Sequence, residues 1–258
     1  MRNVFPYLTL AAALALAGCG GMQDLGSGAS LGNLTQAGGS AMKAFTLSDG
    51  DIQKLSNESC AQNDAQAKVA GADDKYTRRL AKVMQRMPTT VAGQPIGYKV
   101  YLTGDVNAWA MANGCVRVYS GLMDLMNDDE LRAVLGHEEG HVALGHSKKA
   151  MQVAYAAVAA RQAVGAAGGA AAALSQSQLG DLSEKLVNAQ FSQAQENDAD
   201  DYAFDLLTRQ ELPRRGLVTA FEKLGKLDNG QTSMFSSHPS SADRAANMQM
   251  RINGGRKK

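Results

Sequence analysis

The amino-acid sequence predicts a mainly helical α+β domain that contains one small antiparallel β-sheet. Two observations lead to this fold class. Apolar residues recur at helical spacing in several segments, and three short runs between residues 97 and 119 have the composition of strands. Of the 258 residues, 45% are hydrophobic and 20% are charged, which excludes a disordered chain. The net charge of +1 argues against nucleic acid as a partner.

The pattern of the N-terminal residues is typical of an export signal. Arg2 precedes an apolar run over residues 4–17, which is too short to span a membrane but is typical of a secretory signal peptide. The Leu-Ala-Gly-Cys run that ends at Cys19 resembles the lipobox of bacterial lipoproteins. This resemblance implies that residues 1–18 are a lipoprotein signal peptide and that Cys19 carries acyl chains such as palmitate. The alternative is an ordinary signal peptide with an incidental cysteine.

The residues after Cys19 indicate where the protein is located in the cell and where its folded domain begins. By resemblance to Gram-negative lipoproteins, Gly20 favours the outer membrane, so we expect a cell-envelope protein on its periplasmic face, held by the lipid anchor. Residues 19–40 hold the lipidated cysteine and a Gly- and Ser-rich flexible tether, and 41–258 form the folded domain. Cys60 and Cys115 remain for a disulfide in an oxidising compartment, or else for two separate buried thiols.

For the first half of the domain, the sequence predicts one helix and the β-sheet. The helix has an apolar face and ends at Pro88; this face consists of Tyr76, Leu80, Val83, Met84 and Met87. The expected strands cover residues 97–102, 107–111 and 116–119, and Asn113-Gly114 forms the turn between the last two.

For the second half of the domain, the sequence predicts helices. Asn127 and Glu130 form a capping box for a helix that continues through Val142, and residues 194–207 form another. Ala-rich residues 151–174 are expected to be a close-packed helix or helical hairpin between them, the alternative being a segment that dips into a membrane. A further amphipathic helix contains Phe221, Leu224 and Leu227, and residues 254–258 form a frayed basic tail.

The first of these helices carries the pattern H-E-x-x-H. His137 and His141 are four residues apart, so both imidazoles lie on one helix face and can bind one zinc ion. Glu138 is placed to hold and deprotonate a water molecule at that ion. The alternative is two surface histidines on a helix face.

The helix over residues 194–207 supplies a third candidate ligand. Glu196 and Asp200 are four apart and share a face. Glu196 can complete a His₂Glu zinc site, and Asp200 can accept a hydrogen bond from the far nitrogen of a ligating histidine. The alternative is an acidic, solvated helix face.

Together these motifs resemble a known family. The run Gly136-His137-Glu138-Glu139-Gly140-His141, then Glu196 with Asp200, then Ser237-His238-Pro239 with Arg244 resembles the HtpX/Oma-type zinc metallopeptidases, gluzincins related to the CAAX prenyl proteases. The resemblance covers roughly residues 97–250 and is nearest to the lipid-anchored periplasmic members. It implies a zincin-like metallopeptidase domain with one Zn²⁺ per chain, in which His238 stabilises an oxyanion and Arg244 supports the site. His146 also matches the family, and we expect it to be structural or to lie directly behind a metal ligand. Glu139 departs from the family, which often has an apolar residue there.

The expected function is a zinc-dependent endopeptidase of the cell envelope. Zinc bound by His137, His141 and Glu196 would activate water with Glu138 as base. The polypeptide substrate would pair with the strands between Asn107 and Tyr119. The resemblance implies unfolded or damaged envelope proteins as substrates, hence a role in protein quality control. The alternatives are a zinc-stabilised binding or chaperone-like lipoprotein with little turnover, and a structural lipoprotein that binds no metal.

Overall fold

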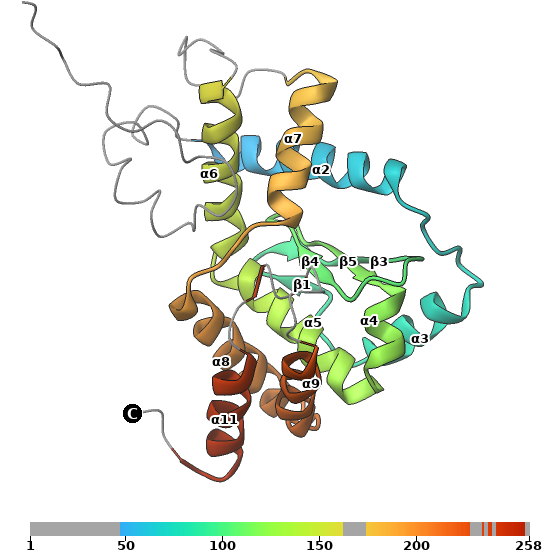
Figure 1. Ribbon diagram of the computed structural model, residues 1–258, viewed down its shortest axis with the longest axis vertical. Helices are drawn as coiled ribbons and strands as arrows, with labels where there is room; N and C mark the ends of the chain where they lie inside the picture. Colours follow the sequence, from blue (N-terminus) through green and yellow to red (C-terminus); the bar gives the residue numbers. More distant parts are fainter. Residues whose placement is uncertain (1–46, 162–173, 228–233, 235–236, 239–240, 256–258) are drawn as a thin grey trace, which may run out of the picture.

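The computed structural model describes residues 47–161, 174–227, 234, 237–238 and 241–255 (Figure 1). The predicted signal peptide, the lipidated Cys19 and the tether over residues 19–40 lie outside the described residues. So do residues 162–173, which belong to the Ala-rich segment, and the last residues of the basic tail.

The described elements are mainly helices, as the sequence predicts. In chain order they are α2 (Asp49–Gln66), α3 (Lys75–Val83), β1 (Thr90–Val91), β2 (Gln94–Pro95), β3 (Gly97–Tyr101), β4 (Ala108–Ala110), β5 (Cys115–Tyr119), α4 (Ser120–Leu125), α5 (Asp128–Ala143), α6 (His146–Arg161), α7 (Gln176–Val187), α8 (Gln193–Arg209), α9 (Arg215–Lys226) and α11 (Ser241–Ile252). The predicted fold class is therefore confirmed. None of the described helices is both long and apolar enough to cross a bilayer.

The main sheet is mixed, which corrects the expectation of an antiparallel sheet. Strands β4 and β5 form the predicted antiparallel hairpin, in which Gly114 has φ of 79°. The order is β3-β5-β4, so β5 lies between the other two and pairs with β3 in parallel. The reason is that the chain turns back between β3 and β4 without pairing them, which leaves the place between them for the returning β5.

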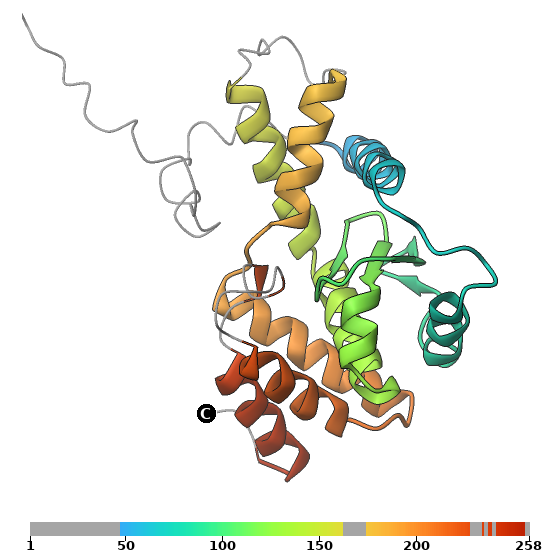
Figure 2. The same ribbon diagram turned by 45° about the vertical axis from the view of Figure 1, so that its right-hand side comes forward.

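Helix α5 runs through the middle of the molecule and positions the site. Helices α8, α9 and α11 pack together on one side of it, and the sheet lies on the other (Figures 1 and 2). Its first turn has the predicted capping box, in which the Asn127 side chain accepts from the Glu130 amide and the Glu130 side chain accepts from the Asn127 amide. The central core consists of apolar side chains from α5, the sheet and these helices.

Helices α6 and α7 run side by side at the upper end of the molecule, with α2 beside them (Figures 1 and 2). A separate apolar cluster holds these three helices together and includes Leu55, Met151 and Leu182. The described part of the Ala-rich segment thus packs against protein, as expected for a close-packed helix.

Helix α2 is attached to the sheet by covalent and ionic contacts. Cys60 of α2 forms a disulfide with Cys115 of β5. One turn further on, Asp64 receives two hydrogen bonds from Arg117 of β5, at 2.7 and 2.9 Å, and one each from Lys99 and Tyr101 of β3. These contacts fix helix α2 on the sheet.

Candidate metal centre

Helix α5 presents both histidines of the H-E-x-x-H pattern on one buried face. The Nε2 atoms of His137 and His141 lie 3.1 Å apart. Each of the two residues is no more than 1% exposed. When each neutral ring carries its proton on Nδ1, both Nε2 atoms offer a lone pair and can bind one shared cation.

Close packing of α5 against α8 brings in the third candidate ligand. A Cβ atom on Gly140 would lie only 3.0 Å from the backbone of Ala199, and Gly136 lies against Ala203 in the same way, at 3.6 Å. These small residues let the two helices approach each other. As a result Glu196, in the first turn of α8, points its carboxylate at the two histidines.

The donor atoms have the separations that a tetrahedral ion requires. Glu196 Oε1 lies 3.3 Å from His141 Nε2, and Glu196 Oε2 lies 3.5 Å from His137 Nε2. Ligands at 2.0–2.1 Å from a tetrahedral zinc ion are separated by about 3.3 Å. Because the donors are nitrogen, nitrogen and carboxylate oxygen, the residues present fit zinc.

His238 belongs to the same group of donors. Its Nδ1 lies 2.9 Å from Glu196 Oε1 and 3.3 Å from His137 Nε2, and the ring is 5% exposed. One ligand atom from each of these four residues lies within 4.8 Å of every other. Its pKa is raised: burial alone would lower it, but the charges of Glu196 and Glu138 favour the protonated ring. From the sequence, His238 was expected to face the site and stabilise an oxyanion, but it was not expected among the donor atoms themselves.

Asp200 and Arg244 support the centre from the far side. Asp200 Oδ1 lies 2.8 Å from His137 Nδ1, and Arg244 binds both oxygens of Asp200, at 2.6 and 2.8 Å. The remaining guanidinium nitrogen, Nη1, lies 2.6 Å from Glu196 Oε2. Burial opposes ionisation of Asp200, but Arg244 holds the pKa of this carboxyl below its usual value. The structure thus brings together both supporting residues that the sequence analysis named.

Glu138 is buried beside the donors. Its Oε1 lies 3.5 Å from His238 Nε2 and makes no hydrogen bond within the described residues. Burial raises the pKa of this carboxyl, and shifted pKa values are common among groups at catalytic sites. Burial also raises the pKa of the neighbouring Glu139, to about 7, but this residue is hydrogen-bonded to the hydroxyl of Tyr98 in β3.

Two further residues surround His141 and carried no clear signal in the sequence. The ring of Phe191, just before α8, stacks on His141 with 3.8 Å between ring centres. On the other side, His146 Nδ1 lies 3.1 Å from His141 Nδ1. His146 was expected to be structural or to lie directly behind a metal ligand, and Phe191 was not singled out.

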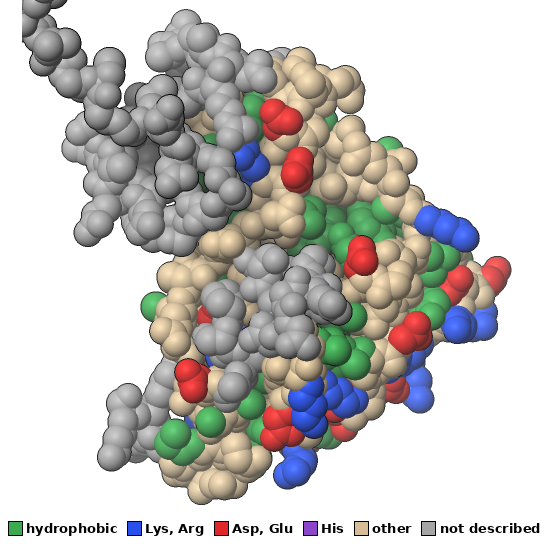
Figure 3. Space-filling model, viewed as in Figure 1, with side chains coloured by type: hydrophobic (Ala, Val, Ile, Leu, Met, Phe, Trp, Pro, Cys, Tyr) green, Lys and Arg blue, Asp and Glu red, His purple; other side chains and the backbone are tan. Residues whose placement is uncertain are grey.

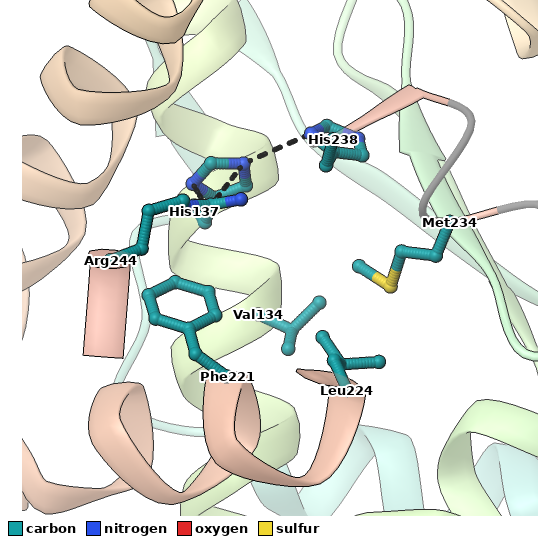
Figure 4. A pocket seen from close by; sticks show the side chains of 7 residues that line it. All are labelled: Val134, His137, Phe221, Leu224, Met234, His238 and Arg244. Carbon is teal, nitrogen blue, oxygen red and sulfur yellow. Dashed lines mark hydrogen bonds between the residues drawn. The ribbon is translucent and has the colours of Figure 1, made fainter. Parts of the chain in front are cut away.

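An apolar pocket adjoins the donors (Figure 4). His137, His238 and Arg244 lie at one end, and apolar side chains from α5, α9 and the segment before His238 form the rest. These apolar lining residues are Val134, Phe221, Leu224 and Met234. The sequence marked Phe221 and Leu224 only as the buried face of an amphipathic helix.

Two histidines and a glutamate from adjacent helices, next to a buried glutamate, define a zincin-like metallopeptidase centre. Comparison with known families agrees with this class. Residues 55–252 match the model of Peptidase family M48, and the chain belongs to this family. It is a zinc metalloprotease, and its substrates are polypeptides.

Curated relatives extend the similarity over the whole chain. Metalloprotease LoiP of Escherichia coli (strain K12) is 50% identical over 246 residues, which is 95% of each chain. Metalloprotease YcaL of the same strain is 48% identical over 258 residues, covering 99% of this chain and 100% of the relative. Protease HtpX of Thioalkalivibrio sulfidiphilus (strain HL-EbGR7) is 50% identical over 50 residues, 18% of this chain and 17% of the relative.

Proposed function

We propose that this protein is a lipid-anchored endopeptidase of the bacterial cell envelope that degrades unfolded or damaged envelope proteins. The peptidase activity in this proposal is supported by one observation: the buried Glu138 carboxylate lies beside the donor group of His137, His141 and Glu196. These three residues are the proposed zinc ligands. Bound zinc would polarise the scissile carbonyl and lower the pKa of water.

In the proposed reaction, Glu138 takes the proton of the attacking water and delivers it to the leaving amide nitrogen. Its buried position and raised pKa suit both halves of this transfer. His238 is proposed to donate a hydrogen bond to the carbonyl oxygen as negative charge develops on it. Asp200 accepts from His137 Nδ1–H and so directs the Nε2 lone pair toward the ion, while Arg244 holds Asp200 and Glu196 in place.

Strand β4 is the proposed docking edge for the substrate backbone. The bonds Met111 N–H to Cys115 O and Tyr119 N–H to Asn107 O show that alternate residues of this strand are bonded to β5. In that register the peptide groups of Ala108 and Ala110 point away from β5. The Ala110 carbonyl accepts from Ser147 Oγ at 3.0 Å, and we propose that the other peptide groups on this edge bind an extended peptide.

The preference for unfolded protein follows from this mode of binding. Only an extended segment can pair with a strand edge, and folded substrates rarely offer one. The pocket next to His137 would take an apolar side chain beside the scissile bond, and such side chains are buried in folded proteins. Apolar side chains also gather on the face of the molecule that Figure 3 shows. Tyr119, Leu186 and Val187 are partly buried apolar side chains that pack together beside the sheet.

The experiment compares one polypeptide in two states. The full-length protein, purified in detergent, is incubated with a disulfide-bonded periplasmic protein and with the same protein after reduction and alkylation. We expect zinc-dependent cleavage of the unfolded form at least tenfold faster than that of the folded form. Equal rates would contradict the proposed substrate class, and zinc retention without any cleavage would favour a binding or chaperone-like role.

The location is tested through Cys19. Replacement of this residue by serine removes the proposed acylation site, so the Cys19→Ser variant should lose incorporated palmitate and leave the outer-membrane fraction. The Cys60→Ser variant is the control, because it removes a cysteine of the folded domain and leaves the lipid site intact. Palmitate incorporation that persists in Cys19→Ser would refute the anchor.

A further inference from the structure

We propose that His146 is a positioning residue of the metal centre: it accepts a hydrogen bond from Nδ1–H of His141 and thereby presents the Nε2 lone pair of His141 to the metal. The inference rests on the proposed ligation by His141. It assigns a function to a residue that lies outside the H-E-x-x-H motif.

The distances specify which nitrogen of each ring carries a proton. His141 Nε2 faces the other donors, 3.1 Å from His137 Nε2 and 3.3 Å from Glu196 Oε1. If Nε2 binds a metal, the proton of a neutral His141 resides on Nδ1. The atom next to it is His146 Nδ1, at 3.1 Å, which must then be unprotonated and act as acceptor. His146 is accordingly the tautomer with its proton on Nε2.

The fold places His146 there by a break in the helix. In a continuous helix, residues five apart are rotated by about 140° around the axis and do not meet. Here α5 ends at Ala143, Gly145 adopts φ of 72°, and α6 starts at His146. The left-handed glycine turns the chain so that the first side chain of α6 returns to His141.

The same corner is tied to the proposed substrate strand. Ser147, the next residue, donates from Oγ to the Ala110 carbonyl of β4 at 3.0 Å. Phe191 stacks on the His141 ring at 3.8 Å between ring centres. His141 is therefore fixed by a ring contact on its face and by His146 at its edge, and the residue after His146 anchors the corner to β4.

The two proposed imidazole ligands thus have different partners. His137 Nδ1 is held by the Asp200 carboxylate at 2.8 Å, whereas His141 Nδ1 is held by an imidazole. Loss of such a partner generally weakens metal binding 10- to 100-fold. Because a neutral acceptor forms a weaker bond than a carboxylate, we expect the effect at His146 to lie near tenfold.

The test measures zinc affinity by competition with a chelator, in full-length protein and without reference to peptidase activity. His146→Leu removes the acceptor, and His146→Asn restores one, because the asparagine oxygen can take the position of Nδ1. Ser147→Ala is the matched control, since it loosens the same corner without touching His141. Melting temperatures of the zinc-free variants report on packing alone.

We expect zinc affinity to fall about tenfold in His146→Leu, to recover to within about threefold in His146→Asn, and to be unchanged in Ser147→Ala. Unchanged affinity in a folded His146→Leu variant would overturn the proposal, and so would equal losses in the Leu and Asn variants. If His146→Leu does not fold, ¹⁵N NMR of the histidine rings in the zinc-loaded wild type decides: a proton on Nδ1 of His146 would overturn it. Full zinc affinity in His141→Ala would instead contradict the ligation on which the proposal rests.

Discussion

The Asp200 carboxylate lies 2.8 Å from Nδ1 of His137, on the side of the ring that faces away from the other donors. Arg244 binds both oxygens of Asp200 and also contacts Glu196, so one guanidinium connects the proposed ligand of α8 with the residue that orients a ligand of α5. All these groups are buried, and their charges compensate one another.

Zinc affinity should therefore depend on Asp200. We predict that Asp200→Asn weakens zinc binding by 10- to 100-fold, because the asparagine oxygen still accepts from His137 but has lost the charge that balances Arg244. Competition with a chelator measures the effect. Asp198→Asn removes a carboxylate from an exposed position of the same helix and should leave zinc affinity unchanged. Equal affinities of Asp200→Asn and the wild type would refute this role.

Much of the centre was predictable because the proposed ligands follow helical spacing. His137 with His141, and Glu196 with Asp200, are each four residues apart, and a helix places such pairs on one face. The contact between α5 and α8 was not predictable from spacing, since it depends on Gly136 and Gly140 packing against alanines of another helix. Glu196 was paired with the two histidines because a zinc site needs a third ligand, and the family resemblance agreed with this assignment.

Low pH should weaken the contacts through which Asp64 holds helix α2 on the sheet. Burial opposes ionisation of Asp64, but hydrogen bonds from Arg117, Lys99 and Tyr101 lower its pKa from 3.8 to about 2. The ionised carboxylate therefore stabilises the fold by about 2 kcal/mol above the unfolded-state pKa of about 3.9, and this contribution disappears as the pH falls from about 4 to 2.

Denaturant unfolding of wild type and Asp64→Asn tests this prediction. The variant should be less stable at pH 6, and the difference should shrink as the pH approaches 2. Asp73→Asn, which changes an exposed carboxylate, should follow the wild type. A difference between wild type and Asp64→Asn that does not vary with pH would show that the contacts of Asp64 do not depend on its charge.

The pocket next to His137 should discriminate between substrate side chains by their size. Leu224 lines this pocket and is 3% exposed. Leu224→Ala enlarges the pocket. We measure kcat/KM for peptides with a large aromatic residue at the cleavage site and for peptides with a small apolar residue there. The ratio of the first value to the second should rise roughly tenfold in the variant. Because a ratio is measured on one variant, it does not depend on the folded fraction.

Leu227→Ala serves as the control for this pocket, since Leu227 ends the same helix and does not line the pocket. Its ratio should equal that of the wild type. If Leu224→Ala also leaves the ratio unchanged, the substrate side chain binds elsewhere.

The parts of the fold that the sequence did not predict depend on long-range packing. Strand β3 has the composition of any half-buried strand, and nothing local specifies that it pairs with β5 in parallel. The pocket combines side chains from α5, α9, α11 and the segment before His238, so no single pattern reveals it. The contact between His141 and His146 depends on the left-handed Gly145, because helical spacing alone would separate them.

Glu138 is proposed to be the base of a zinc peptidase. The most direct measurement is cleavage of an unfolded protein by full-length wild type, Glu138→Gln and Glu139→Gln, with the zinc content of each determined. Glu139 is the matched control, since it is a buried carboxylate on the same helix whose partner is Tyr98. We predict that Glu138→Gln keeps its zinc and loses at least 10²-fold in rate, while Glu139→Gln remains active. A zinc-loaded Glu138→Gln variant that cleaves as fast as the wild type would contradict the account.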